Sequence, residues 1–154
     1  MPLNIKDLTI SSPAFQPGGA IPTRHTGEGE DVSPALEWSG VPEGTAQLAL
    51  ICHDPDAPRP HGFTHWVAYG IPASANGIGE GGGGAFVEGM ADGGKPGYGG
   101  PMPPEGHGPH HYYFWLYALD TELDAAPGLS RAELLDRIAD HVIEQARLVG
   151  TYER

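Results

Sequence analysis

Tyr112-Tyr-Phe-Trp-Leu-Tyr-Ala-Leu119 forms a dense apolar run, and Gln47-Leu-Ala-Leu-Ile-Cys52 forms another. Without these runs the composition would suggest disorder, because the 154 residues include 24 glycines and 16 prolines and carry a net charge of −12. Runs this dense can bury themselves, which indicates a folded, loop-rich protein. We expect one domain, residues 1–154, with a modest core.

Further short apolar segments are separated by Pro and Gly, which is typical of strands joined by turns. No helical pattern lies between them, so a sandwich or barrel is favoured over alternating strands and helices. The glycine-rich segment 77–84 is interpreted as a flexible surface loop, because it lacks the Lys-Ser/Thr of a phosphate-binding loop. The predicted strands are Ile5–Ile10, Ala35–Trp38, Ala46–Asp54, Phe63–Ile71, Gly84–Glu88 and Tyr112–Ala118.

One helix is predicted near the end of the sequence. Ser130-Arg-Ala-Glu133 has the form of a capping box, in which each side chain accepts from the other residue's amide. Apolar residues follow at helical spacing, and Gly150 suits the left-handed residue beyond a helix end. We therefore expect a helix over about 131–147 that packs on the sandwich and carries no chemistry. Its apolar positions are Leu135, Ile138, Val142, Ala146 and Val149.

Composition and charge exclude several classes of protein. No apolar stretch approaches the ~20 residues that span a bilayer, and no secretory signal peptide is visible. Cys52 is the single cysteine, which excludes an internal disulfide and fits a reducing compartment. Because 20 acidic residues face 8 basic ones, neither nucleic acid nor an anionic membrane surface is an expected partner. We expect a cytoplasmic protein with a small-molecule ligand.

A first cluster of polar residues directly follows the apolar run Gln47–Cys52. Its sequence is His53-Asp54-Pro55-Asp56-Ala57-Pro58. The two prolines predict a rigid turn, with Asp56 as a turn carboxylate that accepts from nearby amides. Asp54 is the better functional candidate, because a carboxylate beside a histidine orients the ring and raises its pKa. His65 lies further on, next to Trp66, and its spacing alone is more typical of a buried core histidine.

A second cluster precedes the apolar run Tyr112–Leu119 and begins with Gly97-Tyr-Gly-Gly-Pro-Met-Pro-Pro104. The backbone N–H groups of Gly99 and Gly100 could form an anion-binding concavity. His110 and Tyr112 alternate onto one face of the next strand, with His111 and Tyr113 on the other. Such a group suits a phosphate monoester or a carboxylate, although the spacing is equally compatible with a proline-rich loop leading into a core strand.

On these residues the chain resembles the phosphatidylethanolamine-binding protein family, also called Raf kinase inhibitor-like proteins, and most closely its bacterial branch. The resemblance covers nearly the whole chain, and two long motifs in the same order make it specific. The matching segments are Asp54–Pro58 with His65-Trp66 and Ile71-Pro72, Gly97–Pro104 with Gly108 and His110–Tyr112, Leu116–Asp120, Asp31–Pro34 with Trp38–Pro42, and Leu148–Tyr152.

The resemblance implies a β-sandwich of two antiparallel sheets with Greek-key connections and a small pocket for phosphate-like or carboxylate anions and phospholipid headgroups. A cis bond before Pro58 is also implied, because such a bond shapes the pocket in the family. Bacterial relatives suggest a homodimer. Carried over by position, the pocket contains Asp54, Pro58, His65, Gly99, Gly100, Pro101, His110 and Tyr112.

The sequence departs from the family pattern at three positions. Met102 stands where a cysteine is common, and we expect it to change packing more than ligand chemistry. His111 stands in place of an arginine that could form a structural ion pair. Gly70 replaces an asparagine before Ile-Pro and could loosen that strand end. The role of His53 stays open.

The favoured function is non-catalytic binding of a small anion, with no cofactor and no metal. His65 and His110 would donate to the anion, Tyr112 would donate its hydroxyl, and Asp54 would hold an imidazole and accept from a protonated oxygen or an ethanolamine-type amine. Binding would strengthen as the pH falls toward the histidine pKa.

Two other functions stay open. The first is regulatory inhibition or scaffolding of a kinase or protease, which the resemblance allows because eukaryotic members regulate kinases and a fungal member inhibits a carboxypeptidase. The second is a metal-dependent enzyme, because the two clusters contain histidines and aspartates that suit Zn²⁺ or Fe²⁺. Neither a His-Glu-x-x-His motif nor paired cysteines supports it.

Overall fold

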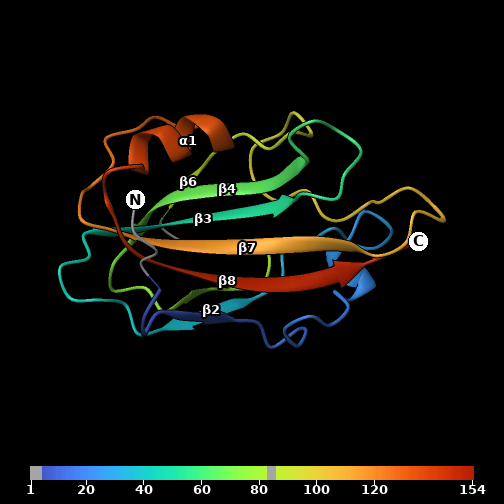
Figure 1. Ribbon diagram of the computed structural model, residues 1–154, viewed down its shortest axis with the longest axis horizontal. Coiled ribbons are helices and arrows are strands. Elements are labelled where there is room, and N and C mark those ends of the chain that lie inside the picture. Colours follow the sequence, from blue (N-terminus) through green and yellow to red (C-terminus); the bar gives the residue numbers. More distant parts are fainter. Residues whose placement is uncertain (1–4, 83–85) are drawn as a thin grey trace.

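The computed structural model describes residues 5–82 and 86–154, which form two antiparallel β-sheets and one short α-helix (Figure 1). The larger sheet has five strands in the order β6-β4-β3-β7-β8, and the smaller has three in the order β1-β2-β5. The larger sheet comprises β6 (Val87–Glu88), β4 (Phe63–Pro72), β3 (Gln47–Asp54), β7 (His110–Leu119) and β8 (Val142–Tyr152). The smaller comprises β1 (Thr9–Ser11), β2 (Leu36–Ser39) and β5 (Gly77–Ile78), and the helices are η1 (Thr23–His25) and α1 (Arg131–Ile138).

The strand order confirms the expected sandwich with a Greek-key connection. β3, β4 and β6 are neighbours in sheet order, and β7 returns to pair with the other edge of β3. This is the Greek-key arrangement, in which the fourth strand lies beside the first. Consequently the C-terminal end of β3 and the N-terminal ends of β4 and β7 lie at the same end of the sheet.

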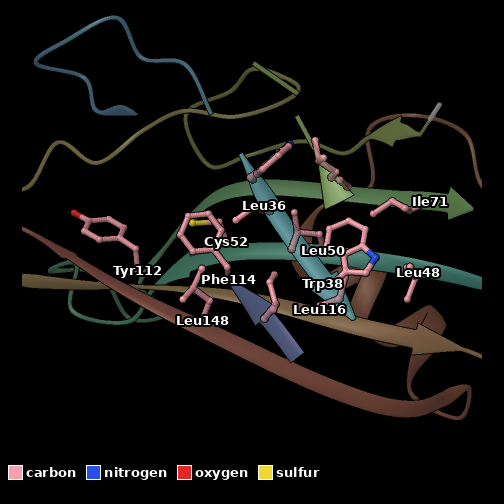
Figure 2. Packing of buried hydrophobic residues seen from close by; sticks show 14 of the residues in the cluster. Leu36, Trp38, Leu48, Leu50, Cys52, Ile71, Tyr112, Phe114, Leu116 and Leu148 are labelled. Atoms are coloured by element: carbon pink, nitrogen blue, oxygen red, sulfur yellow. The ribbon is translucent and has the colours of Figure 1, made fainter. Parts of the chain in front are cut away.

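The long apolar runs are explained by burial of the large sheet on both faces. Alternate residues of β3, such as Leu48 and Leu50, pack against Leu36 and Trp38 of β2, as Figure 2 shows. The intervening residues of β3 pack instead against α1, whose Leu134 is fully buried. A strand covered on both faces needs apolar residues at every position, which is why this run shows no polar alternation.

The predicted C-terminal helix is right at its start and wrong in its extent. The capping box is present, with Ser130 Oγ accepting from the Glu133 amide at 3.2 Å and Glu133 Oε1 accepting from the Ser130 amide at 3.0 Å. The helix ends at Ile138, however, and Val142–Tyr152 forms β8 along the full length of β7. Pairing with β7 outweighs the helical spacing, because it satisfies the backbone of both strands and buries apolar side chains from β8.

Gly150 is therefore a strand residue and not a helix cap. A β-carbon at this position would lie 2.7 Å from side-chain atoms of both Ile21 and Phe15. The N-terminal segment thus packs directly on the backbone of β8, which only glycine permits at this distance.

The remaining strand predictions differ from the structure mainly at their ends. β5 occupies the start of segment 77–84, which was expected to be a loop, because Gly77 and Ile78 pair with the free edge of β2. The predicted strand Ile5–Ile10 is shortened to β1, and Gly84–Glu88 is represented by β6, with residues 83–85 outside the described part of the chain. Among the residues that the structure describes, no helix has the length and apolar character to cross a membrane.

Candidate functional site

A pocket of about 330 Å³ opens where β3 ends and β4 and β7 begin. It contains six of the eight predicted site residues, while Gly99 and Pro101 do not line it. The lining residues are Asp54, Ala57, Pro58, Arg59, Phe63, His65, Gly100, Met102, Pro103, Pro104, His110 and Tyr112.

A β-bulge directs His65 into this pocket. Cys52 of β3 pairs with Trp66 of β4, but the next residue, His53, pairs with Thr64, so His65 is an extra residue in β4. Strict alternation would place His65 on the face opposite Trp66, and the bulge re-aims it. The ring lies 5.2 Å from the Tyr112 ring in an edge-on contact. This bulge, which sequence spacing did not reveal, turns a residue with core-like spacing into a pocket residue.

One nitrogen of His65 is committed to the protein and the other is not. Nδ1 lies 2.6 Å from the carbonyl oxygen of Gly99 and donates to it. The ring faces the pocket with Nε2 as its second polar atom. Burial lowers the pKa of His65 below its usual value, so the neutral ring dominates at neutral pH.

Asp54 and His110 form a buried pair beneath the pocket. His110 Nδ1 donates to Asp54 Oδ2 at 2.6 Å, and the side chains are only 2% and 3% exposed, respectively. Asp54 Oδ1 also accepts from the Asp56 amide at 2.7 Å, which fixes the turn after β3. His110 is therefore the imidazole that Asp54 contacts at the pocket.

His107 extends this pair into a chain of three groups. His107 Nδ1 lies 2.6 Å from His110 Nε2. Because Asp54 accepts from Nδ1 of His110, a neutral His110 must accept through Nε2, and His107 is then the donor. Both nitrogens of His110 are thus occupied, contrary to the expectation that His110 donates to a ligand.

Tyr112 has a buried hydroxyl without a hydrogen-bond partner among the described residues. The residue is 1% exposed and lines the pocket. Burial raises the pKa of Tyr112, so the hydroxyl keeps its proton and remains a donor. Buried hydroxyls nearly always have a partner, so a water molecule or a ligand in the pocket would supply the acceptor.

Arg59 is a pocket residue that the sequence analysis missed. Its guanidinium carbon lies 5.3 Å from the centre of the Phe63 ring, and within residues 5–82 and 86–154 no carboxylate pairs with it. A permanent cation therefore stands at the rim of the pocket. Its position directly after Asp54–Pro58 was a signal that could have been used.

The predicted anion cradle of glycine amides is wrong. The Gly99 amide donates to the His65 carbonyl at 2.9 Å, and the Gly100 amide donates to Asp31 Oδ1 at 2.7 Å. Both donors are used to hold the loop against the rest of the protein, so neither is free to bind an anion. Pro101 has a similar role, since its carbonyl accepts from the Gly27 amide at 2.9 Å.

The bond before Pro58 is trans, contrary to expectation, and no described residue has a cis peptide bond. The chain turns here by a different route. The Arg59 amide donates to the Ala57 carbonyl at 2.7 Å, which closes a three-residue turn centred on Pro58. The fixed φ of a trans proline suits this turn.

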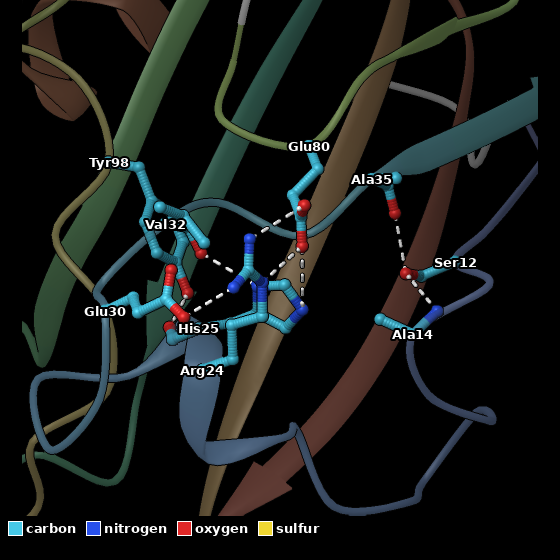
Figure 3. Close-up of polar contacts among 9 residues, drawn as sticks. All are labelled: Ser12, Ala14, Arg24, His25, Glu30, Val32, Ala35, Glu80 and Tyr98. Atoms are coloured by element: carbon cyan, nitrogen blue, oxygen red, sulfur yellow. Dashed lines mark hydrogen bonds and ion pairs between the residues drawn. The ribbon is translucent and has the colours of Figure 1, made fainter.

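A cluster of charged and polar groups holds the segment that carries Asp31 (Figure 3). Arg24 bonds Glu80 at 2.8 Å and also pairs with Glu30. His25 Nδ1 donates to the Val32 carbonyl at 2.8 Å. This segment is therefore fixed at both ends around Asp31, whose φ of 58° is held by the structure on either side.

His111 and Gly70 have structural roles. Both the amide and Nδ1 of His111 donate to Asp56 Oδ2, at 2.8 and 2.7 Å. The prediction that Asp56 accepts from amides of its own turn is therefore wrong: Asp54 is the carboxylate that accepts there, and Asp56 contributes its amide. Gly70 has φ of 65° where β4 has an irregular pairing with β3. Glycine and asparagine both tolerate this conformation, which accounts for the exchange at this position.

His53 lies outside the pocket, and its Nδ1 is 3.0 Å from Thr64 Oγ1. Burial lowers its pKa to about 4, so the folded protein keeps this ring neutral at pH values where the unfolded chain is protonated. The resulting stability is complete above about pH 6.5 and is lost as the pH falls toward 4.

We therefore expect the melting temperature to fall between pH 6.5 and 4, and to fall less steeply in His53→Gln. The largest slope that one such group contributes is about 1.4 kcal/mol per pH unit. Thermal melts at several pH values measure it, with the exposed His141→Gln as the control. Equal slopes in the two variants would contradict the assignment.

Among the described residues, no three His, Cys, Asp or Glu side chains are placed to hold a metal ion. Cys52 is buried in the core between the sheets, and burial raises its pKa well above the usual value. The thiol is therefore in its unreactive form.

Comparison with known proteins places the fold and the motifs together. Residues 11–153 match the family model described as phosphatidylethanolamine-binding protein. A UPF0098 protein of Methanothermobacter thermautotrophicus is 44% identical over 153 residues, covering 96% of this chain and 99% of its own. The structure of the homologue CT736 from Chlamydia trachomatis superposes with a TM-score of 0.90 at 36% identity, covering 96% and 97% of the two chains. E. coli YbcL superposes with a TM-score of 0.91 at 34% identity, covering 97% and 99%.

Proposed function

Because this chain belongs to the phosphatidylethanolamine-binding protein family, we propose that it binds a small anion, such as a phosphate monoester, in the pocket beside Tyr112 and His65 without transforming it. The observation that supports this most directly is the unpartnered, buried hydroxyl of Tyr112. An anion oxygen in the pocket is an acceptor of the kind that this donor lacks.

The other groups around the pocket give the anion a positive and apolar setting. Arg59 supplies a permanent charge at the rim. His65 adds a donor when Nε2 takes up a proton, because Nδ1 remains bonded to Gly99. A hydrogen bond from His110 stabilises the Asp54 carboxylate, which can also accept from a protonated ligand oxygen or an amine.

The chemistry of the buried histidines supports binding over catalysis. The chain from Asp54 through His110 ends at His107, which is another imidazole and not a hydroxyl or thiol that it could activate. Cys52 is enclosed in the core. A bound anion would therefore meet donors but no activated nucleophile from these groups.

Sulfate provides the cleanest test, because its charge does not change between about pH 8 and pH 5, where histidine titrates. Burial lowers the pKa of free His65, and a bound anion raises it again, so affinity should increase as the pH falls, by up to about tenfold per pH unit. Calorimetric titration of sulfate at pH 8, 7, 6 and 5 measures this dependence.

Two variants separate the donors in this titration. His65→Gln should flatten the pH dependence, and Tyr112→Phe should weaken sulfate about tenfold at every pH through loss of one hydrogen bond to a charged acceptor. An affinity that stays constant with pH in the wild-type protein, or that Tyr112→Phe leaves unchanged, would contradict the proposal.

A further inference from the structure

A second cavity, of about 280 Å³, adjoins the anion pocket. The two cavities share the lining residues Phe63, Gly100 and Met102, so they lie next to each other. A molecule that places an anion beside Tyr112 could therefore extend past Met102 into the second space. The first cavity alone would leave such an extension unrecognised.

Two opposite charges line the second cavity and do not pair with each other. Asp31 uses Oδ1 to accept from the Gly100 amide, and Oδ2 has no partner among the described residues. The Lys95 ammonium forms no ion pair with any described residue. Lys95 is one of only two lysines in a chain with a net charge of −12. Both Asp31 and Lys95 are exposed at the mouth of the cavity, where a ligand can reach them.

Both charges are carried by backbone that is held in place. Asp31 lies in the segment fixed by the Arg24 cluster (Figure 3). Lys95 closes a tight turn, in which the Ala91 amide donates to the Lys95 carbonyl at 3.2 Å. Between them the cavity is lined by apolar groups, including Phe63, Ala91 and Met102.

We propose that the second cavity is a subsite for a free α-amino acid group, with Asp31 accepting from its ammonium and Lys95 donating to its carboxylate. The inference rests on the proposed function of the first pocket. Together the two cavities select a phosphate monoester of a hydroxy-amino acid, with the phosphate beside Tyr112 and the zwitterion beside Asp31 and Lys95. The free amino acid is required, because a residue within a peptide has neither charge.

The test is a calorimetric comparison of four probes: O-phosphoserine, phosphoethanolamine, inorganic phosphate, and phosphoserine blocked at both its amino and carboxyl groups. An ion pair at a partly exposed site is worth up to about fivefold in affinity. We therefore expect O-phosphoserine to bind more tightly than the blocked form by up to about twenty-fivefold, with phosphoethanolamine in between.

Conservative variants assign each charge. Asp31→Asn keeps an acceptor for the Gly100 amide and tolerates φ of 58°, so it removes the charge while preserving the fold. It should remove the preference for an amine. Lys95→Gln should make O-phosphoserine bind no better than phosphoethanolamine. Lys6→Gln, which removes the other lysine, should change nothing.

The outcomes distinguish the two proposals. If inorganic phosphate binds but free and blocked phosphoserine bind equally, the subsite is wrong and the anion pocket stands. If Asp31→Asn and Lys95→Gln leave the order of the four probes unchanged, the subsite is again wrong. If none of the four probes binds to the wild-type protein, both proposals fall.

Discussion

Asp54→Ala is expected to lower the free energy of unfolding by about 3 kcal/mol, because it leaves two donors without their partner in a buried site. His110 Nδ1 and the Asp56 amide both donate to this carboxylate. Alanine would leave both donors unpaired in a site whose side chains are almost fully enclosed. Urea unfolding measures this loss.

Asp56→Ala is the matched control. Asp56 also contacts a histidine at nearly the same distance, 2.7 Å, and lies on the same turn. Its side chain is 41% exposed, however, and that of His111 is 47% exposed, so water can replace the lost contact. We expect a loss of about 1 kcal/mol or less. Equal losses in the two variants would show that burial does not set the value of the Asp54 pair.

Gly100→Ala is expected to destabilise the protein by about 3 kcal/mol through overpacking and loss of a hydrogen bond to a carboxylate. A β-carbon here would lie 2.4 Å from the His25 carbonyl oxygen and 2.6 Å from Asp31 Oδ1. These atoms belong to the segment that faces Gly100, so the two segments must separate. The change should also weaken sulfate binding, because Gly100 lines the pocket.

Gly99→Ala tests whether this effect is specific. No atom lies within 4 Å of a β-carbon built at Gly99, whose φ is not in the left-handed region. We expect a change within about 0.5 kcal/mol. Urea unfolding of both variants decides the point, and a large loss in Gly99→Ala would mean that the loop is constrained by something other than the close approach to Asp31.

The fold could be predicted where the signal was local. The apolar composition of the run around Phe114 predicts a buried strand, and the spacing of Ser130 and Glu133 predicts the start of a helix. β8 could not be found in this way, because Val142, Ala146 and Val149 fit a helical stripe as well as a strand. They form a strand because they pair with the edge of β7 opposite β3, and β7 lies on the other side of α1 in the sequence.

The candidate site divides along the same line. Asp54 and Tyr112 could be assigned to one end of a sheet from strand alternation and the family motifs. The bulge at His65 could not, because one extra residue in a strand leaves no mark in the spacing. The partners of the Gly99 and Gly100 amides depend on His65 and Asp31, which only the folded chain brings close.

The central position of β3 has a consequence for how the protein opens. This strand is paired on both edges and covered on both faces, so its amides should exchange with deuterium only when the whole domain unfolds. Asp54 is its last residue and therefore belongs to the slowest-exchanging unit. The 97–108 segment has no long strand pairing and should exchange sooner. One side of the site, at Asp54, would then stay folded while the other side, the 97–108 segment, opens locally. This opening provides a route for a ligand to enter without global unfolding.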